Sequence, residues 1–269
     1  MARAVHPRPG PAVSIVAVFN QKGGVGKTTT TLNLAAALSA RQRHPLVIDL
    51  DPQASLTLAM GLRNVPREGS LYAFFKDGRP LTELVRQHPS GADLIPGSFD
   101  LSKIEALHGS DMTISRRLKE GLAALSAARP VLLDCSPALG VLSLNALLAA
   151  DRVLLPVAAD FLSLEGANKL TAALDVLETR LGKRFERRVV VTRYDARRRL
   201  TAEIHRTLQQ RFGARLCRSV IKENVALAES PMHGKDIFAF SSSSQGAQDY
   251  RALADELEAA GFFGSATTR

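Results

Sequence analysis

The sequence predicts an α/β fold: a single domain with a twisted, mainly parallel β-sheet that is flanked by helices on both faces. Three observations predict it. Short apolar runs alternate with segments of helical periodicity along almost the whole chain, and this alternation is typical of βαβ units. A glycine-rich turn joins the first apolar run to the first helical segment. The chain has 269 residues, of which 45% are hydrophobic, so it can bury a core without disulfides or a structural metal.

The predicted strands are short apolar runs bounded by turn residues. In order, they cover residues 14–19, 45–50, 92–97, 130–136, 152–158, 187–194 and, more weakly, 219–221. Between them, apolar side chains recur at helical spacing, which indicates helices packed on a sheet. These segments are residues 28–41, 112–127, 139–149, 164–181, 200–212 and 247–260, with a helical but loop-rich stretch at 56–76. A crossover through a helix makes the strands that it joins parallel.

The two ends of the chain lack this periodicity. Residues 1–12 hold three prolines and are predicted to form a flexible basic arm, followed by the domain at 13–263 and a tail at 264–269. No apolar segment fits a signal peptide or a membrane span. The two cysteines, Cys135 and Cys217, are too few for a disulfide framework or a structural zinc site. We therefore expect a cytoplasmic protein without stable membrane insertion.

Positive charge is concentrated in one region. The chain has 35 basic and 26 acidic residues, a net charge of +9, and residues 180–222 alone hold 14 Lys or Arg against 3 Asp or Glu. The remainder is therefore close to neutral. Such a region is either a well-solvated basic surface or a face for nucleic acid, where Lys and Arg release counterions from the phosphate backbone.

The glycine-rich turn, QKGGVGKTTT at residues 21–30, has the context of a phosphate-binding loop, because it follows a strand and opens a helix. Glycines let successive backbone N–H groups point at phosphate oxygens, and the helix N-terminus adds a favourable dipole. Lys27 would contact the β- and γ-phosphates, and the Thr28 hydroxyl would ligate Mg²⁺. The predicted nucleotide-binding residues are Lys22, Gly23, Gly24, Val25, Gly26, Lys27, Thr28 and Thr29.

The loop departs from the general pattern, since Gln21 stands where a glycine is usual and a second lysine, Lys22, precedes the glycines. With these features the chain resembles the deviant Walker A ATPases, and within them the ParA/Soj family of chromosome and plasmid partition proteins. VIDLDPQAS (47–55), LLDCSPALGVLSLNAL (132–147) and NVALAESPMHGK (224–235) follow that family in order. The resemblance extends from about residue 14 to residue 261.

The resemblance implies an ATPase of slow intrinsic rate that uses ATP and Mg²⁺ and forms an ATP-bound sandwich dimer. Lys22 would reach across the dimer to the partner's phosphates, a contribution of about 10³–10⁵ in rate in related chemistry. Asp51 would orient the attacking water, so the implied catalytic residues are Lys22, Lys27 and Asp51. Asp49 and Asp134, at the ends of two strands, would hold Mg²⁺ together with Thr28, through water.

The family usually binds double-stranded DNA without sequence preference, and a ParB-like protein stimulates hydrolysis. We therefore expect a nucleoid-associated protein that drives the segregation or positioning of plasmid or chromosomal DNA. The basic residues available for DNA are Arg193, Arg197, Arg198, Arg199, Arg218 and Lys222. Glu223 and Ala226 stand where relatives often carry arginines used for DNA. Our hypothesis is that the arginine cluster at 197–199 and Lys222 compensate for them.

Three alternatives remain open. Members of the family also position non-DNA cargo, such as protein clusters, microcompartments, or secretion or conjugation machinery, and no motif separates these cargoes. A MinD-like, membrane-associated ATPase would need a C-terminal helix with a basic polar face, whereas residues 248–260 carry a net charge of −3. An iron protein of the nitrogenase type would need cysteine pairs for an iron–sulfur cluster, and neither Cys135 nor Cys217 is suitably placed.

Overall fold

The computed structural model describes residues 14–108, 114–125 and 129–264. Within these residues, seven strands form one sheet in the order β3-β2-β4-β1-β5-β6-β7, and every pair of neighbouring strands is parallel. The strands are β1 (Ile15–Val18), β2 (Leu46–Asp49), β3 (Asp93–Ile95), β4 (Val131–Asp134), β5 (Arg152–Ala158), β6 (Glu186–Tyr194) and β7 (Leu216–Lys222). The parallel sheet confirms the fold class that the alternation of elements predicts.

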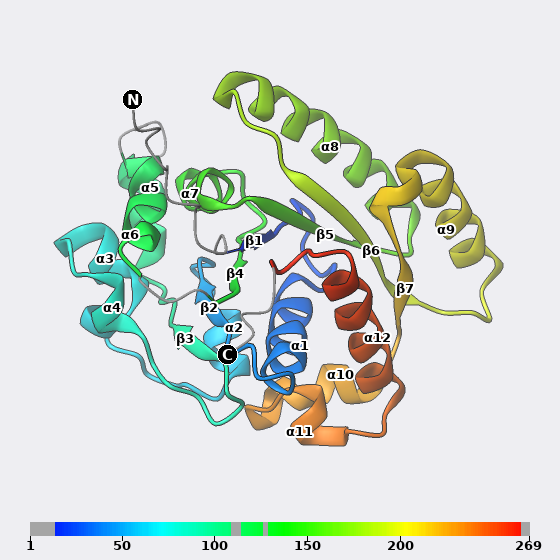
Figure 1. Ribbon diagram of the computed structural model, residues 1–269, viewed down its shortest axis with the longest axis horizontal. Helices are drawn as coiled ribbons and strands as arrows, with labels where there is room; N and C mark the ends of the chain where they lie inside the picture. Colours follow the sequence, from blue (N-terminus) through cyan, green and yellow to red (C-terminus); the bar gives the residue numbers. More distant parts are fainter. Residues whose placement is uncertain (1–13, 109–113, 126–128, 265–269) are drawn as a thin grey trace, which may run out of the picture.

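Helices cover both faces of the sheet (Figure 1). One face carries α1 (Lys27–Ser39), α2 (Ser55–Ala59), α10 (Val225–Glu229), α11 (Ile237–Ser241) and α12 (Gln245–Ala259). The other face carries α3 (Leu71–Asp77), α4 (Leu81–Leu84), α5 (Leu101–His108), α6 (Arg117–Ala123), α7 (Val141–Ala149), α8 (Phe161–Leu181) and α9 (Arg199–Phe212). Successive residues of β1 point into opposite cores: Val16 and Val18 face α1, while Ala17 faces the other layer. This double burial explains why the strands read as continuous apolar runs.

The sheet topology places the functional loops together. β1 lies at the centre, between β4 and β5, and β2 pairs with β4 in a register that sets Asp49 beside Asp134. Because all strands are parallel, their carboxyl ends lie at one edge of the sheet. The loops after β1, β2 and β4 therefore meet there, at the kind of edge where ligands bind in open α/β sheets.

Several element boundaries differ from those expected. The stretch at 56–76 is divided into α2, a short 3₁₀ turn at Arg67–Gly69 and α3, because Gly61 adopts a φ of +81° and Pro66 follows. α8 begins at Phe161, three residues early, since the Asp160 side chain caps it. β7 extends beyond the expected 219–221 at both ends, and α4, α5, α10 and α11 were not predicted.

Some expectations fall partly or wholly outside the described residues. These are the arm at 1–12, most of the tail at 264–269, and both ends of the expected helix at 112–127. The described part of that helix is a 3₁₀ turn, Ile114–Arg116, followed by α6. Among the helices of the described ranges, none is long and apolar enough to cross a membrane.

Candidate nucleotide-binding site

The loop between β1 and α1 has the backbone of a phosphate-binding loop. Gly24 and Gly26 have φ values of +73° and +88°, in the left-handed region that favours glycine. A Cβ on Gly24 would meet no atom within 4 Å, so glycine is required here for its conformation and not for space. The Thr192 hydroxyl of β6 donates a 2.8 Å hydrogen bond to the Val25 carbonyl. This bond ties the loop to β6, which lies two strands away from β1 in the sheet.

Lys27 lies at the first position of α1 with 7% of its surface exposed. Its ammonium donates a 3.1 Å hydrogen bond to the backbone carbonyl of Lys22, across the loop. Burial lowers the pKa of Lys27, while the negative charge of Asp134 opposes that shift. A buried cation that points across the loop is suited to bind a phosphate group, which would replace the carbonyl as its partner.

Asp134 ends β4 as a fully buried carboxylate. It accepts hydrogen bonds from the hydroxyls of Thr28, at 2.8 Å, and Thr31, at 3.3 Å. Burial raises the pKa of Asp134 well above its usual range, and the neighbouring Asp49 carboxyl raises it further. The structure thus brings Thr28 and Asp134 together as the sequence predicts.

This pair fits a magnesium ion. A hydroxyl and a carboxylate are the hard oxygen ligands that Mg²⁺ prefers, and the ion keeps waters and shares substrate phosphates. Within the described ranges no group of three or more His, Cys, Asp or Glu side chains is placed to hold a metal ion. Phosphate oxygens and water would have to complete the coordination shell.

Asp49 and Asp51 occupy different environments although both follow β2. Asp49 is fully buried, and its carboxylate accepts hydrogen bonds from Thr57 and from the Asp51 amide. Burial raises the pKa of Asp49 to about 6. Asp51 is partly exposed, and its carboxylate accepts a 2.9 Å hydrogen bond from the Gln53 amide. Asp51 is therefore the more accessible of the two carboxylates.

Lys22 is paired within its own chain. Its ammonium lies 2.7 Å from Asp160 Oδ1 and 2.9 Å from the Ser163 hydroxyl, both at the start of α8. Burial acts to raise the pKa of Asp160, but the hydrogen bonds from Lys22 and Ser163 outweigh it and lower that pKa. Sequence reasoning did not identify Asp160 as the partner of Lys22, because the two residues lie 138 positions apart.

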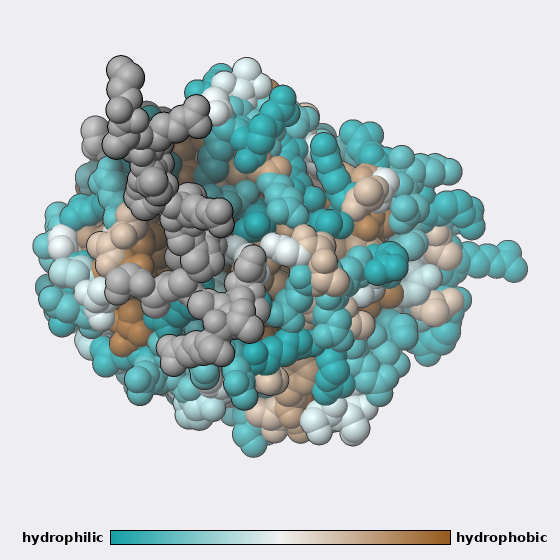
Figure 2. All heavy atoms as spheres, viewed as in Figure 1, coloured by the Kyte–Doolittle hydropathy of each residue, from teal (hydrophilic) through white to brown (hydrophobic). Residues whose placement is uncertain are grey.

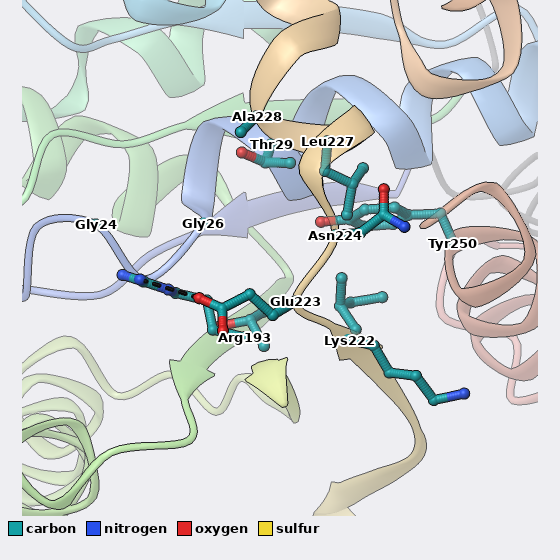
Figure 3. A pocket seen from close by; sticks show the side chains of 12 residues that line it. Gly24, Gly26, Thr29, Arg193, Lys222, Glu223, Asn224, Leu227, Ala228 and Tyr250 are labelled. Atoms are coloured by element: carbon teal, nitrogen blue, oxygen red, sulfur yellow. Dashed lines mark hydrogen bonds and ion pairs between the residues drawn. The ribbon is translucent and has the colours of Figure 1, made fainter. Parts of the chain in front are cut away.

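A pocket of about 280 Å³ adjoins the phosphate loop (Figure 3). It lies between the loop and the ends of β6 and β7, and its lining residues are Gly24, Gly26, Thr29, Thr192, Arg193, Ile221, Lys222, Glu223, Asn224, Leu227, Ala228 and Tyr250. Asn224 Oδ1 is buried without a hydrogen-bond partner in the described parts of the chain, and a ligand donor group would satisfy it. Sequence reasoning missed Thr192, Asn224 and Tyr250, since no local pattern marks them as pocket residues.

The residues expected to bind DNA lie in a mixed-charge environment. Arg193 pairs with Glu223 at 3.4 Å, Arg197 with Asp195 at 2.9 Å, Arg198 with Asp195 at 3.2 Å, and Arg218 with Glu256 at 3.9 Å. Figure 3 shows Arg193 extending toward Gly24, with its ion pair to Glu223, whereas Lys222 points away from the pocket. The structure thus separates Arg193, beside the nucleotide pocket, from the more exposed arginines.

Comparisons with known proteins agree with this geometry. A family model described as an AAA domain matches residues 13–187. The chromosome partitioning protein ParA of Caulobacter vibrioides is 37% identical over 90% of this chain and 93% of that protein. The sporulation initiation inhibitor protein Soj of Bacillus subtilis is 33% identical over 92% of this chain and 99% of that protein. Cobyrinic acid a,c-diamide synthase of Mycobacterium smegmatis, solved with ADP and magnesium, has a TM-score of 0.79 at 27% identity, covering 96% of this chain and all of that one.

A parallel α/β domain with this loop and this buried acid is a P-loop ATPase. The matches extend over most of the sequence, and the chain belongs to the ParA/MinD-type family of these enzymes. The family resemblance that the motifs indicate is therefore confirmed. Relatives solved with ADP or an ATP analogue and magnesium support the expected cofactors, ATP and Mg²⁺.

Proposed function

We propose that the protein is a ParA-like ATPase that binds ATP and Mg²⁺, forms an ATP-bound sandwich dimer and binds DNA without sequence preference. A ParB-like partner accelerates its slow hydrolysis and releases it from DNA, and the cycle positions chromosomal or plasmid DNA on the nucleoid in the cytoplasm. The observation that carries the proposal is the phosphate loop with its second lysine, Lys22, whose ammonium contacts Asp160 at the N-terminus of α8. The ParA and Soj relatives support the choice of cargo.

In this proposal each residue of the site has a separate role in ATP binding or hydrolysis. The amides from Gly23 to Gly26 and the Lys27 ammonium bind the phosphates, and the base and ribose occupy the adjoining pocket. Thr28 and Asp134 would hold Mg²⁺, which when bound neutralises charge on the phosphate oxygens. Asp51, the accessible carboxylate after β2, orients the water. Lys22 supplies a positive charge to the partner's phosphates once it leaves Asp160.

The ion pairs favour α9 as the centre of the DNA-binding surface. Arg199 and Arg206 are exposed and lie two turns apart on α9, and neither has an ion pair in the described ranges. The exposed Arg211 and Arg215 are likewise unpaired within those ranges. By contrast, Arg197 and Arg198 share Asp195 as a partner. Figure 2 shows that the surface over α8 and α9 is mostly hydrophilic in this view. Unpaired cations release more counterions on binding phosphates than cations already neutralised by a carboxylate.

Binding of a random-sequence DNA duplex tests the proposal, measured with ATP, with ADP and without nucleotide across a salt titration. We expect tight binding with ATP alone, with an affinity that falls steeply as salt rises. Binding that does not depend on ATP would contradict the nucleotide-switched dimer. Absence of DNA binding, with ATP hydrolysis retained, would instead favour an ATPase that positions a non-DNA cargo.

A further inference from the structure

Asp49, the last residue of β2, connects three segments of the chain through one carboxylate. Its Oδ2 accepts hydrogen bonds from the Thr57 hydroxyl at 2.7 Å and from the Thr57 amide at 2.9 Å, and its Oδ1 accepts one from the Asp51 amide at 3.1 Å. The Thr57 hydroxyl in turn accepts a 2.9 Å hydrogen bond from the Gly97 amide. The end of β2, helix α2 and the segment after β3 are thereby held together.

This network has little room to rearrange. Asp49 is 0% exposed and Thr57 is 2% exposed. A Cβ on Gly97 would lie 2.9 Å from Asp49 Cγ and 3.0 Å from the Asp49 carbonyl oxygen, so the Gly97 backbone packs directly on the carboxylate. Buried polar groups whose partners are all satisfied rigidify the surrounding backbone.

The position of Asp51 depends on this network. Its amide is bound by Asp49, its carbonyl accepts a 2.8 Å hydrogen bond from the Ala54 amide, and its carboxylate accepts one from Gln53. Ala54 has a φ of +51°, a conformation uncommon for alanine. The loop that carries Asp51 is therefore held in a strained turn between Asp49 and the start of α2, on which Thr57 lies.

We propose that Thr57, acting through Asp49, is a positioning residue for Asp51 in ATP hydrolysis. The inference rests on the proposed role of Asp51 in orienting the attacking water. In the described structure the hydrogen bonds of the Asp49 carboxylate and the Thr57 hydroxyl go to Asp51, Gly97 and each other, and none goes to the phosphate loop. Loss of the Thr57 hydroxyl should therefore slow turnover without weakening nucleotide binding.

The expectation that Asp49 holds Mg²⁺ makes a different prediction. A metal ligand affects the Mg²⁺ concentration at which hydrolysis is half-maximal, whereas a positioning group affects the maximal rate. Asp49→Asn keeps the volume of the side chain but has only one acceptor oxygen, so it cannot accept hydrogen bonds from both Thr57 and the Asp51 amide as the carboxylate does. If Asp49→Asn lowers kcat and leaves the half-saturating Mg²⁺ concentration unchanged, Asp49 acts in positioning Asp51. If it shifts the half-saturating Mg²⁺ concentration and leaves kcat unchanged, the inference is overturned.

The main test compares Thr57→Val, which removes the hydroxyl, with the matched control Thr57→Ser, which retains it. We expect Thr57→Val to lower kcat by about 10- to 100-fold, as misplacement of a catalytic group does, while the Kd for a fluorescent ATP analogue stays within about twofold. Thr57→Ser should restore most of the rate. Thermal unfolding of both variants shows whether each is folded. If Thr57→Val does not fold, Asp49→Asn provides an independent test of the same hydrogen-bond network.

A double-mutant cycle with Asp51→Ala identifies the group through which Thr57 acts. If Thr57 acts through Asp51, Thr57→Val causes no further loss of rate in the Asp51→Ala background. A wild-type rate in Thr57→Val, or an equal loss of rate with and without Asp51, overturns the inference. Asp51→Ala alone reports on the proposed function, so a loss of turnover there, with normal turnover in Thr57→Val, refutes only the role of Thr57.

Discussion

The Lys22 ammonium lies 2.7 Å from Asp160 Oδ1, which places the second lysine of the phosphate loop against the N-terminus of α8 in its own chain. A lysine bound in this way is unavailable to a second copy of the chain. The pair is partly solvent-exposed, with 33% of the Lys22 side chain and 46% of the Asp160 side chain accessible. Its release therefore requires only a modest free energy, on the order of 1 kcal/mol or less.

Asp160→Asn should favour ATP-dependent dimerisation. Asparagine keeps an acceptor for the Ser163 amide, which caps α8, but it removes the charge that holds Lys22. We expect the dimerisation Kd with ATP to fall by up to about fivefold, the equivalent of about 1 kcal/mol. Sedimentation velocity over a range of protein concentrations measures this Kd. Ser163→Ala removes the hydroxyl contact of Lys22 but keeps the Asp160 charge, so it shows how much of the effect comes from the charge. An unchanged Kd in Asp160→Asn would rule out the competition between the two partners.

Lys27→Ala should abolish tight nucleotide binding. A hydrogen bond between an ammonium and a phosphate contributes about 1.5–3 kcal/mol, so the Kd for ATP should rise by about 10- to 100-fold. Titration with a fluorescent ATP analogue measures the change. Lys22→Ala serves as the matched control, because Lys22 should act only in the dimer and its loss should leave monomer affinity near that of the wild type. Retained affinity in Lys27→Ala would contradict the role of the loop.

Asp51→Ala should bind ATP normally but hydrolyse it far more slowly than the wild type. Without the carboxylate that we propose to orient the water, the ATP-bound dimer should persist, and dissociation from DNA should slow along with hydrolysis. Single-turnover hydrolysis and the lifetime of the DNA complex measure the two effects. Normal turnover in this variant would show that another group orients the water.

Arg199→Gln/Arg206→Gln should weaken DNA binding more than Arg197→Gln/Arg198→Gln, although each double variant removes two positive charges. Arg197 and Arg198 are already paired with Asp195. If both unpaired arginines contact phosphates, their loss should reduce the slope of log K against log salt by about 2. An ATP-dependent DNA-binding assay across a salt series measures both slopes. Equal losses in the two variants would contradict the assignment of the surface to α9.

Glycine-to-alanine changes at Gly97 and Gly166 should alter stability in opposite directions. A Cβ at Gly97 would collide with Asp49, whereas a Cβ at Gly166, inside α8, would meet nothing within 4 Å. Gly97→Ala should lower the free energy of unfolding by about 1–3 kcal/mol, and Gly166→Ala should raise it by about 0.5–1 kcal/mol. Chemical denaturation measures both. Equal stability of the two variants would refute the close contact at Asp49.

The phosphate loop was predictable from the sequence because all its parts are local. Gly24, Gly26, Lys27 and Thr28 follow one another, and the strand before them and the helix after them have their own apolar patterns. The helices α10 and α11 have five residues each, which is too short for periodicity to be visible. The start of α8 was predicted three residues too late, because the Asp160 side chain caps its first turn and apolar periodicity does not show that cap.

Within the site, the sequence identified which residues take part but not which of them contact one another. The family resemblance assigned Asp51 to the attacking water and Asp49 and Asp134 to Mg²⁺. Only the structure shows that Asp51 is accessible and that Asp49 is buried and bound to Thr57. The register of β2 against β4 is what sets Asp49 beside Asp134. No pattern within one strand reports that register.

Spacing along the chain was therefore enough to determine the parallel α/β class, the phosphate loop and the excess of positive charge at residues 180–222. The tertiary structure alone decided which of those charges are neutralised, that Lys22 faces Asp160, and that Asn224 and Tyr250 complete the pocket. The physical reason is that backbone periodicity arises between near neighbours. The ion pair of Lys22 with Asp160 and the pocket beside the phosphate loop form between side chains that are far apart in sequence and meet only when the sheet and its two helical layers are assembled.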